Sequence, residues 1–264
     1  MKVSTNGVEI NYSIEGSGTE WITLSHSLAC NMSMWDEQMD LLKPNFKVLR
    51  FDTRGHGGSS APAGAYTLEQ LADDVHGLFA ALGIKQTHWV GLSMGGMIGQ
   101  TYALKYPGVF KSMVLADTTS RRPPNAAQMW GDRIKAVEAG GMQAVLQGTL
   151  ERWFTAPYRA KHPEVMARIS AGILATPPAG FIGACQAISQ IDVMDRLKEI
   201  KCPTLVTVGD QDHGTPPEMA KIIHENLPGS ELFIIPDAAH IASIEQKDVF
   251  NKMLGDFLAK VSVK

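Results

Sequence analysis

Residues 91–96, with the sequence GLSMGG, constrain the fold of this chain more than any other segment. They follow an apolar run at residues 87–90 and predict a sharp turn from a buried strand into a helix. Such a turn lifts the Ser93 side chain above the sheet edge, beside the positive end of a helix. The glycines around Ser93 lack Cβ atoms, for which a strained, closely packed turn has no room. The segment predicts a nucleophilic serine, and a glycine-rich turn with an idle serine is the alternative.

A serine nucleophile needs a histidine base and a carboxylate, here expected in the chain order serine, acid, histidine. The β-branched run at residues 204–209 predicts a buried strand, and Asp212 follows it. Residues 231–236 predict a second strand, which His240 follows. The carboxyl ends of parallel strands meet at one edge of a sheet. We therefore expect Ser93, Asp212 and His240 to converge there.

Two neighbouring residues compete for these roles. Asp210 follows Gly209 directly and could serve as the acid or simply cap the strand end. Asp212 lies one short loop further along the chain. His213 would sit beside the acid rather than across from Ser93, so it is interpreted as a loop residue.

Strands and helices alternate over most of the chain, which is typical of an α/β fold with a mostly parallel, doubly wound sheet. Residues 8–14 and 21–25 predict an opening pair of strands, expected to be antiparallel. Residues 66–82 predict an amphipathic helix that begins with a capping box at residues 67–70 and stops at residue 83. A second capping box is predicted at residues 215–218.

The strand pattern disappears between residues 117 and 202, where helical stretches are punctuated by prolines. We expect residues 119–201 to form a helical cap over the edge that carries Ser93, with residues 1–118 and 202–264 forming the core. A separate helical interaction domain is the alternative. The predicted helical stretches are residues 125–139, 142–154, 163–175 and 179–191.

The formal net charge of −3 disfavours a nucleic-acid partner, which would require a basic surface. The chain opens on a strand-like stretch, and no apolar run approaches the length that spans a membrane. The three cysteines are scattered, without zinc-site spacing, and indicate a reducing compartment. We expect a cytoplasmic protein with a small-molecule partner, no nucleic acid and no membrane. The sequence leaves a homo-oligomer open.

From end to end the chain resembles α/β-hydrolase fold enzymes, and among them most resembles 3-oxoadipate enol-lactonases and related carboxylesterases. In these enzymes the spacing from Gly209 through Asp212 to Pro216 is typical of the acid loop, which favours Asp212 over Asp210. The segments that carry the resemblance are residues 24–28, 34–35, 50–57, 91–96, 152–155, 209–217 and 237–241.

The resemblance also implies an oxyanion hole. Leu28, in the loop after the first central strand, would supply one backbone N–H, and Met94, directly after the nucleophile, would supply the other. Ser27 stands where most members of the superfamily have glycine, a departure that enol-lactonase-like sequences tolerate. His26 is expected to support this loop through hydrogen bonds rather than take part in chemistry.

The activity implied by the resemblance is that of a serine hydrolase, which cleaves carboxylic esters or lactones through an acyl-enzyme without a cofactor or metal. The alternatives are a general carboxylesterase for short or medium acyl esters, a carbon–carbon bond hydrolase of the same fold, and a ligand-binding, receptor-type module. We place Trp35, Trp130, Trp153 and Arg133 in the substrate pocket. For the three tryptophans, packing between the cap and the core is the alternative.

Four arginines in the predicted cap are interpreted as solvated helix charges. One of them would bind a substrate carboxylate if it reached the cleft. They are Arg121, Arg122, Arg133 and Arg152.

Overall fold

In the computed structural model, which describes residues 1–262, eight strands form one sheet in the order β1-β2-β4-β3-β5-β6-β7-β8. The strands from β4 to β8 in this order run parallel, whereas β1 and β2 are antiparallel at one edge. The strands are β1 (Lys2–Thr5), β2 (Val8–Glu15), β3 (Glu20–Ser25), β4 (Phe46–Phe51), β5 (Thr87–Leu92), β6 (Phe110–Ala116), β7 (Thr204–Gly209) and β8 (Glu231–Ile235).

The predicted antiparallel pairing of the first two expected strands is wrong. β2 pairs with β1 through a turn at Asn6 and Gly7, both of which have positive φ, and on its other side with β4. β3 instead lies between β4 and β5 and is parallel to both. The last four residues of β3 are all buried, which suits a central strand, whereas β2 alternates between buried and more exposed residues.

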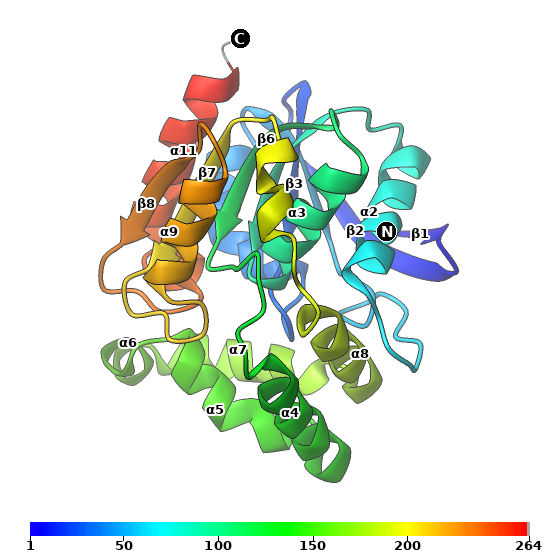
Figure 1. The fold of residues 1–264 in the computed structure, drawn as a ribbon, viewed down its shortest axis with the longest axis vertical. Coiled ribbons are helices and arrows are strands. Elements are labelled where there is room, and N and C mark those ends of the chain that lie inside the picture. The colour runs from blue at the N-terminus through cyan, green and yellow to red at the C-terminus, as the bar shows by residue number, and fades with distance from the viewer. Residues whose placement is uncertain (263–264) are drawn as a thin grey trace.

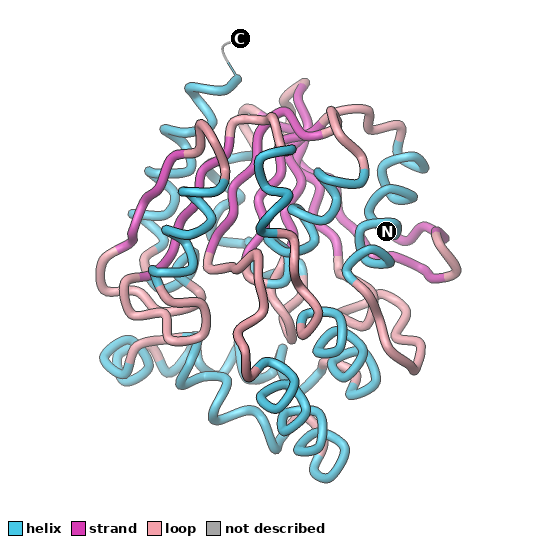
Figure 2. The backbone as a smooth tube through the Cα atoms, viewed as in Figure 1, coloured by secondary structure: helices cyan, strands magenta, loops and turns pink. Residues whose placement is uncertain are grey.

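Helices cover both faces of the sheet (Figures 1 and 2). α2 (Leu68–Leu82), α3 (Met94–Lys105), η2 (Met194–Glu199) and α9 (Pro217–Asn226) pack on one face. The other face carries η1 (Met32–Gln38), α1 (Met39–Leu42), α10 (Ala242–Glu245) and α11 (Lys247–Ser262). The predicted end of α2 is confirmed, because Gly83 caps the helix with a φ of 68°. The helix begins at Leu68, two residues later than predicted, and the Thr67 hydroxyl caps it by accepting from Gln70 N at 3.0 Å.

Five α-helices between β6 and η2 lie across the carboxyl ends of the parallel strands (Figure 1). We call this segment the insertion. The predicted helical stretches are confirmed, and a further short helix, α6, begins where Thr155 caps it with its side chain. The five are α4 (Ala126–Gly140), α5 (Gln143–Trp153), α6 (Ala156–Lys161), α7 (Pro163–Ala175) and α8 (Pro178–Ile188).

Among residues 1–262, no single helix is long and apolar enough to cross a membrane. α7 and α8 reach the required length and composition only as a pair, and a bend of 92° separates them.

Candidate active site

Ser93 sits at the turn between β5 and α3, with φ of 56° and ψ of −112°. Its backbone N–H donates to the Ala116 carbonyl of the next strand at 2.8 Å. A Cβ atom on Gly91 would lie 2.3 Å from the Gly95 carbonyl oxygen, and one on Gly95 would lie 2.2 Å from the Ser25 carbonyl oxygen. Only glycine fits at these two positions. The close packing of backbone around these glycines supports the turn in which Ser93 has its strained, positive φ.

Asp212 and His240 meet beside this turn, although 28 residues separate them in the chain. Oδ2 of Asp212 accepts from His240 Nδ1 at 2.8 Å and from the Thr215 hydroxyl at 2.6 Å. Its Oδ1 accepts from the backbone N–H groups of Gly214 at 2.7 Å and Thr215 at 3.1 Å. The carboxylate is thereby fixed in orientation, and it fixes the histidine ring in turn.

Asp210, the competing acid, is exposed and lies elsewhere in the same loop. Its Oδ1 accepts from the backbone N–H of Ala238 at 3.3 Å, so it braces the end of the strand. The predicted capping box at residues 215–218 is wrong. α9 starts at Pro217 without a side-chain cap, because the Thr215 hydroxyl is used by Asp212.

The charge on Asp212 is maintained in a buried position. Burial alone would raise the pKa of this carboxyl, but His240 and the hydrogen bonds from Thr215 outweigh it and lower the pKa. Asp117, at the end of β6, behaves in the opposite way. Burial and the nearby Asp212 charge raise the pKa of Asp117 well above its usual range, although the Gly209 N–H donates to its Oδ1 at 2.9 Å. The pKa values of these two neighbouring carboxyls are thus shifted in opposite directions.

The loop after β3 is braced by His26, as expected. Nδ1 of its fully buried ring lies 2.7 Å from the Ser27 carbonyl oxygen, and its Nε2 accepts from the Thr53 N–H at 2.9 Å. Burial lowers the pKa of His26, in keeping with a neutral ring that donates from Nδ1 and accepts at Nε2. Leu28 lies two residues after His26 in this loop and lines the same pocket as Ser93. Met94 opens α3, so its backbone N–H has no acceptor inside the helix.

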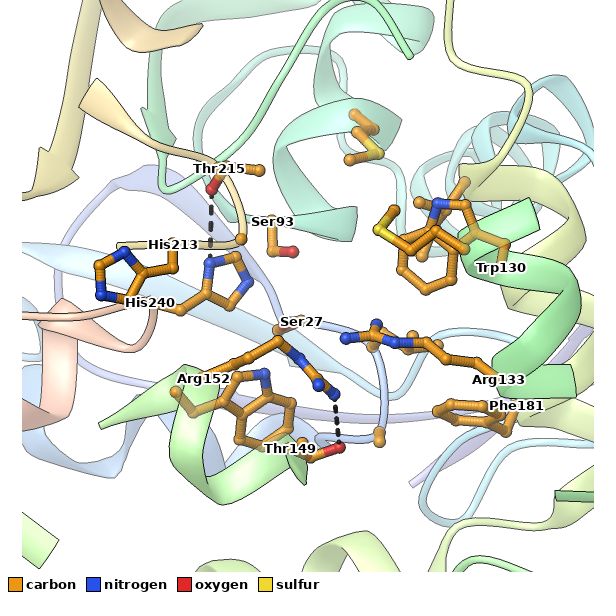
Figure 3. Close-up of a pocket in the computed structure, with 17 residues that line it drawn as sticks. Ser27, Ser93, Trp130, Arg133, Thr149, Arg152, Phe181, His213, Thr215 and His240 are labelled. Atoms are coloured by element: carbon orange, nitrogen blue, oxygen red, sulfur yellow. Dashed lines mark hydrogen bonds between the residues drawn. The ribbon is translucent and has the colours of Figure 1, made fainter. Parts of the chain in front are cut away.

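A cavity of about 150 Å³ lies between this edge of the sheet and the insertion (Figure 3). Ser93 and His240 line one wall of it, and side chains from α4, α5 and α8 line the opposite wall. The predicted pocket residues Trp130, Trp153 and Arg133 all face it. Most of the remaining lining is apolar and includes Met97, Met129, Phe181 and Ile188.

The placement of Trp35 in the pocket is wrong. Its side chain is completely buried, and its ring lies 6.2 Å from that of Phe250 in the helix layer on the other side of the sheet. η1 turns this tryptophan into the core, where it packs between the sheet and α11. His213 lies in the loop after β7, as expected, and its exposed side chain lines the cavity.

Arg133 and Arg152 both enter the cavity, and Figure 3 shows their guanidinium groups pointing toward one another. Among residues 1–262, neither forms an ion pair. Arg133 lies over the Trp130 ring at 4.8 Å, and Arg152 donates to the Thr149 hydroxyl at 3.3 Å. Burial, together with the Arg152 charge, lowers the pKa of Arg133 to about 10. Burial also lowers the pKa of Arg152. Both groups remain cationic at neutral pH.

The other two arginines stay at the surface. Arg121 pairs with Asp192 at 2.9 Å and with Asp195 at 2.7 Å, and Arg122 donates to Gln190. The sequence interpretation of solvated charges is therefore right for this pair and wrong for Arg152. For Arg133 the structure agrees with its placement in the pocket and not with a solvated charge. The signal that separates them is tertiary, since Arg133 lies on α4 and Arg152 on α5, which both line the cavity, whereas Arg121 and Arg122 precede α4.

The arrangement combines a strained serine, a histidine oriented by an ionised carboxylate, and two cations in one small cavity. A family model described as the alpha/beta hydrolase fold matches residues 20–247. The 3-oxoadipate enol-lactonase 2 of Acinetobacter baylyi is 33% identical over 250 residues, which cover 94% of this chain and 92% of that protein.

Two solved structures are also similar. The crystal structure of the enol-lactonase from Burkholderia xenovorans LB400 has a TM-score of 0.95 and 37% identity, covering 98% of this chain and 100% of that one. The thermophilic esterase from Thermogutta terrifontis, solved with malate bound, has a TM-score of 0.93 and 30% identity, covering 99% of this chain and 98% of that one.

Proposed function

This chain belongs to the α/β-hydrolase fold family and is a hydrolase of esters or lactones, and from that premise we propose that it opens an anionic enol-lactone through Ser93. The substrate class is that named for the two enol-lactonases above. The observation that carries the proposal is that two guanidinium groups, which have no carboxylate partner within residues 1–262, share one cavity with Ser93 and His240.

The reaction is acyl transfer to water. The Ser93 hydroxyl attacks the lactone carbonyl carbon while Nε2 of His240 takes its proton, and Asp212 stabilises the imidazolium that forms. The backbone N–H groups of Leu28 and Met94 stabilise the oxyanion, and loss of one such donor typically costs about 3 kcal/mol. The ring C–O bond then breaks. Its oxygen leaves as an enolate, which takes the proton from the His240 imidazolium and tautomerises to a ketone, so that His240 is again neutral. Water activated by His240 hydrolyses the acyl-enzyme.

The two arginines would bind the carboxylate of the substrate. A carboxylate that entered an apolar cavity would lose its hydrogen bonds to water. It would gain nothing in their place unless a cation lay in the cavity, so it requires one there. Planar guanidinium groups suit this task, because they can donate two parallel hydrogen bonds to one carboxylate. Arg133 and Arg152 are already partly desolvated and have no carboxylate partner within the described residues, so an incoming anion would meet two free donors.

We further propose that residues 119–201 act as a cap on a core of residues 1–118 and 202–264. One wall of the cavity is formed by α4, α5 and α8, which supports this division into cap and core. Such a cap would exclude water from the oxyanion and select the substrate.

A general carboxylesterase for neutral esters is the second candidate, and the apolar part of the lining favours it. A direct comparison of kcat/KM for an anionic enol-lactone, a neutral lactone of the same ring and p-nitrophenyl butyrate tests the choice. We expect the anionic lactone to be the fastest substrate. Faster cleavage of the neutral ester would overturn the lactonase proposal and leave the serine hydrolase intact.

A further inference from the structure

The proposed steps do not use Glu245, a buried carboxylate at the end of α10, five residues after His240. Its Oε1 accepts from the backbone N–H of Thr155 at 2.9 Å and from the hydroxyl of Thr155 at 2.6 Å. Its Oε2 accepts from the backbone N–H of Ala239 at 2.8 Å. One carboxylate therefore joins the start of α6 to the residue that precedes His240.

A second connection lies on the other side of the histidine. The backbone N–H of Ile241 donates to the carbonyl oxygen of Trp153 at 3.1 Å. The residues before and after His240 are thus both tied, directly or through Glu245, to the joint between α5 and α6. Trp153 ends α5, and it lines the cavity together with Arg152.

These contacts are unusual for a carboxylate that is 6% exposed. Within residues 1–262 its hydrogen-bond donors are backbone N–H groups and a hydroxyl rather than a cation. A buried charge is costly unless its hydrogen bonds compensate for the lost hydration. A carboxylate suits this position because its two oxygens accept several hydrogen bonds and it has no donor to leave unsatisfied.

We propose that Glu245 is a positioning residue that couples the cavity wall formed by α5 to the His240 loop, and so sets the histidine ring relative to Ser93. This inference rests on the proposed role of His240 as the base. A shift of α5 as ligand enters would be transmitted through residues 153–155 to the residues on both sides of His240. The cap and the base would then adjust as one unit.

The test begins with Glu245→Gln, whose amide NH₂ group must face either the Ala239 or the Thr155 N–H. With p-nitrophenyl butyrate as substrate, we expect kcat to fall about 10- to 100-fold, because a small misplacement of a catalytic group has effects of this size. KM should change by less than about threefold, since Glu245 does not line the cavity.

Substitutions of Thr155 change the same contact with less disruption, so they remain informative if Glu245→Gln does not fold. Thr155→Val removes the hydroxyl donor and keeps the N–H, so kcat should fall by less than in Glu245→Gln. Thr155→Ser retains both donors and should restore kcat. In the double variant Glu245→Gln/Thr155→Val, kcat should fall no further than in Glu245→Gln alone, because the two residues act through one contact.

Thr23→Val is the matched control. It removes a buried hydroxyl that bonds Thr87 at 3.0 Å within the sheet, and we expect a lower Tm with an unchanged kcat. If Thr155→Val and Glu245→Gln both keep the kcat of the unmodified protein, as Thr23→Val is expected to do, the coupling is overturned. Ser93→Ala, run in the same assay, separates the two proposals. If it keeps its activity, the proposed function fails; if it is inactive while Glu245→Gln is not, only the coupling fails.

Discussion

The edge of the sheet formed by the carboxyl ends of the strands, called the edge below, and the insertion face the same cavity. They hold their functional side chains in different ways. At the edge, Ser93 is confined by glycines with no room for a Cβ atom, and Asp212 accepts hydrogen bonds on both oxygens. In the insertion, Arg133 rests on a tryptophan ring and Arg152 has one long hydrogen bond. At the edge, backbone contacts and several hydrogen bonds hold the groups that would make and break bonds. The insertion holds its two cations with fewer contacts, so the side chains proposed to recognise charge are not those proposed to make and break bonds.

The largest effect should come from the edge. Ser93→Ala removes the proposed nucleophile, and we expect activity to fall by about 10⁶-fold. Its thermal unfolding temperature should stay nearly unchanged, because the alanine fills the same space without a hydroxyl. Hydrolysis of p-nitrophenyl butyrate and a melting curve measure both effects. Undiminished hydrolysis would mean that the edge does not perform the chemistry.

A smaller but still large loss is expected for the acid. Asp212→Asn would favour the wrong tautomer of His240 and should lower kcat by about 10⁴-fold. Asp210→Asn is the matched control in the same loop, and its kcat should remain close to that of the unmodified protein. The reverse ranking of these two variants would assign the acid to Asp210.

The buried carboxyl behind the acid should affect stability rather than rate. The raised pKa of Asp117 means that the folded chain binds this proton more tightly than the unfolded chain does. The stability it contributes is fully present below about pH 4 and is lost as pH rises through the folded-state pKa. Asp117→Asn keeps an acceptor for the Gly209 N–H and cannot ionise.

The variant should therefore gain free energy of unfolding relative to the unmodified protein as pH rises from about 4 to about 8. Urea unfolding at several pH values measures the difference. A gap that stays constant or narrows over this range would show that Asp117 is not held neutral.

The sequence was sufficient where function depends on local pattern. A strand followed by a glycine-rich turn predicts the position of Ser93, and two later strands followed by Asp212 and His240 predict the rest of the cluster. The choice of Asp212 over Asp210 came from family resemblance, since both residues follow the same strand. Parallel strands then bring distant residues to one edge, whatever lies between them in the chain.

Sequence reasoning failed where tertiary neighbours decide the outcome. Apolar spacing indicates that β2 and β3 are strands but not that β4 separates them. It cannot distinguish Trp35, which η1 turns into the core, from Trp153, which faces the cavity. The contact of Glu245 with Thr155 joins residues 90 positions apart and has no local signature.

The central claim, that the insertion selects charge while the edge performs the reaction, is tested most directly by the double variant Arg133→Gln/Arg152→Gln. The quantity to measure is the ratio of kcat/KM for an anionic lactone to that for its neutral analogue. A hydrogen bond to a charged group contributes about 1.5–3 kcal/mol, so the ratio should fall at least 10- to 100-fold while the neutral substrate is hardly affected. A ratio that remains unchanged, or an equal loss on both substrates, would contradict the account.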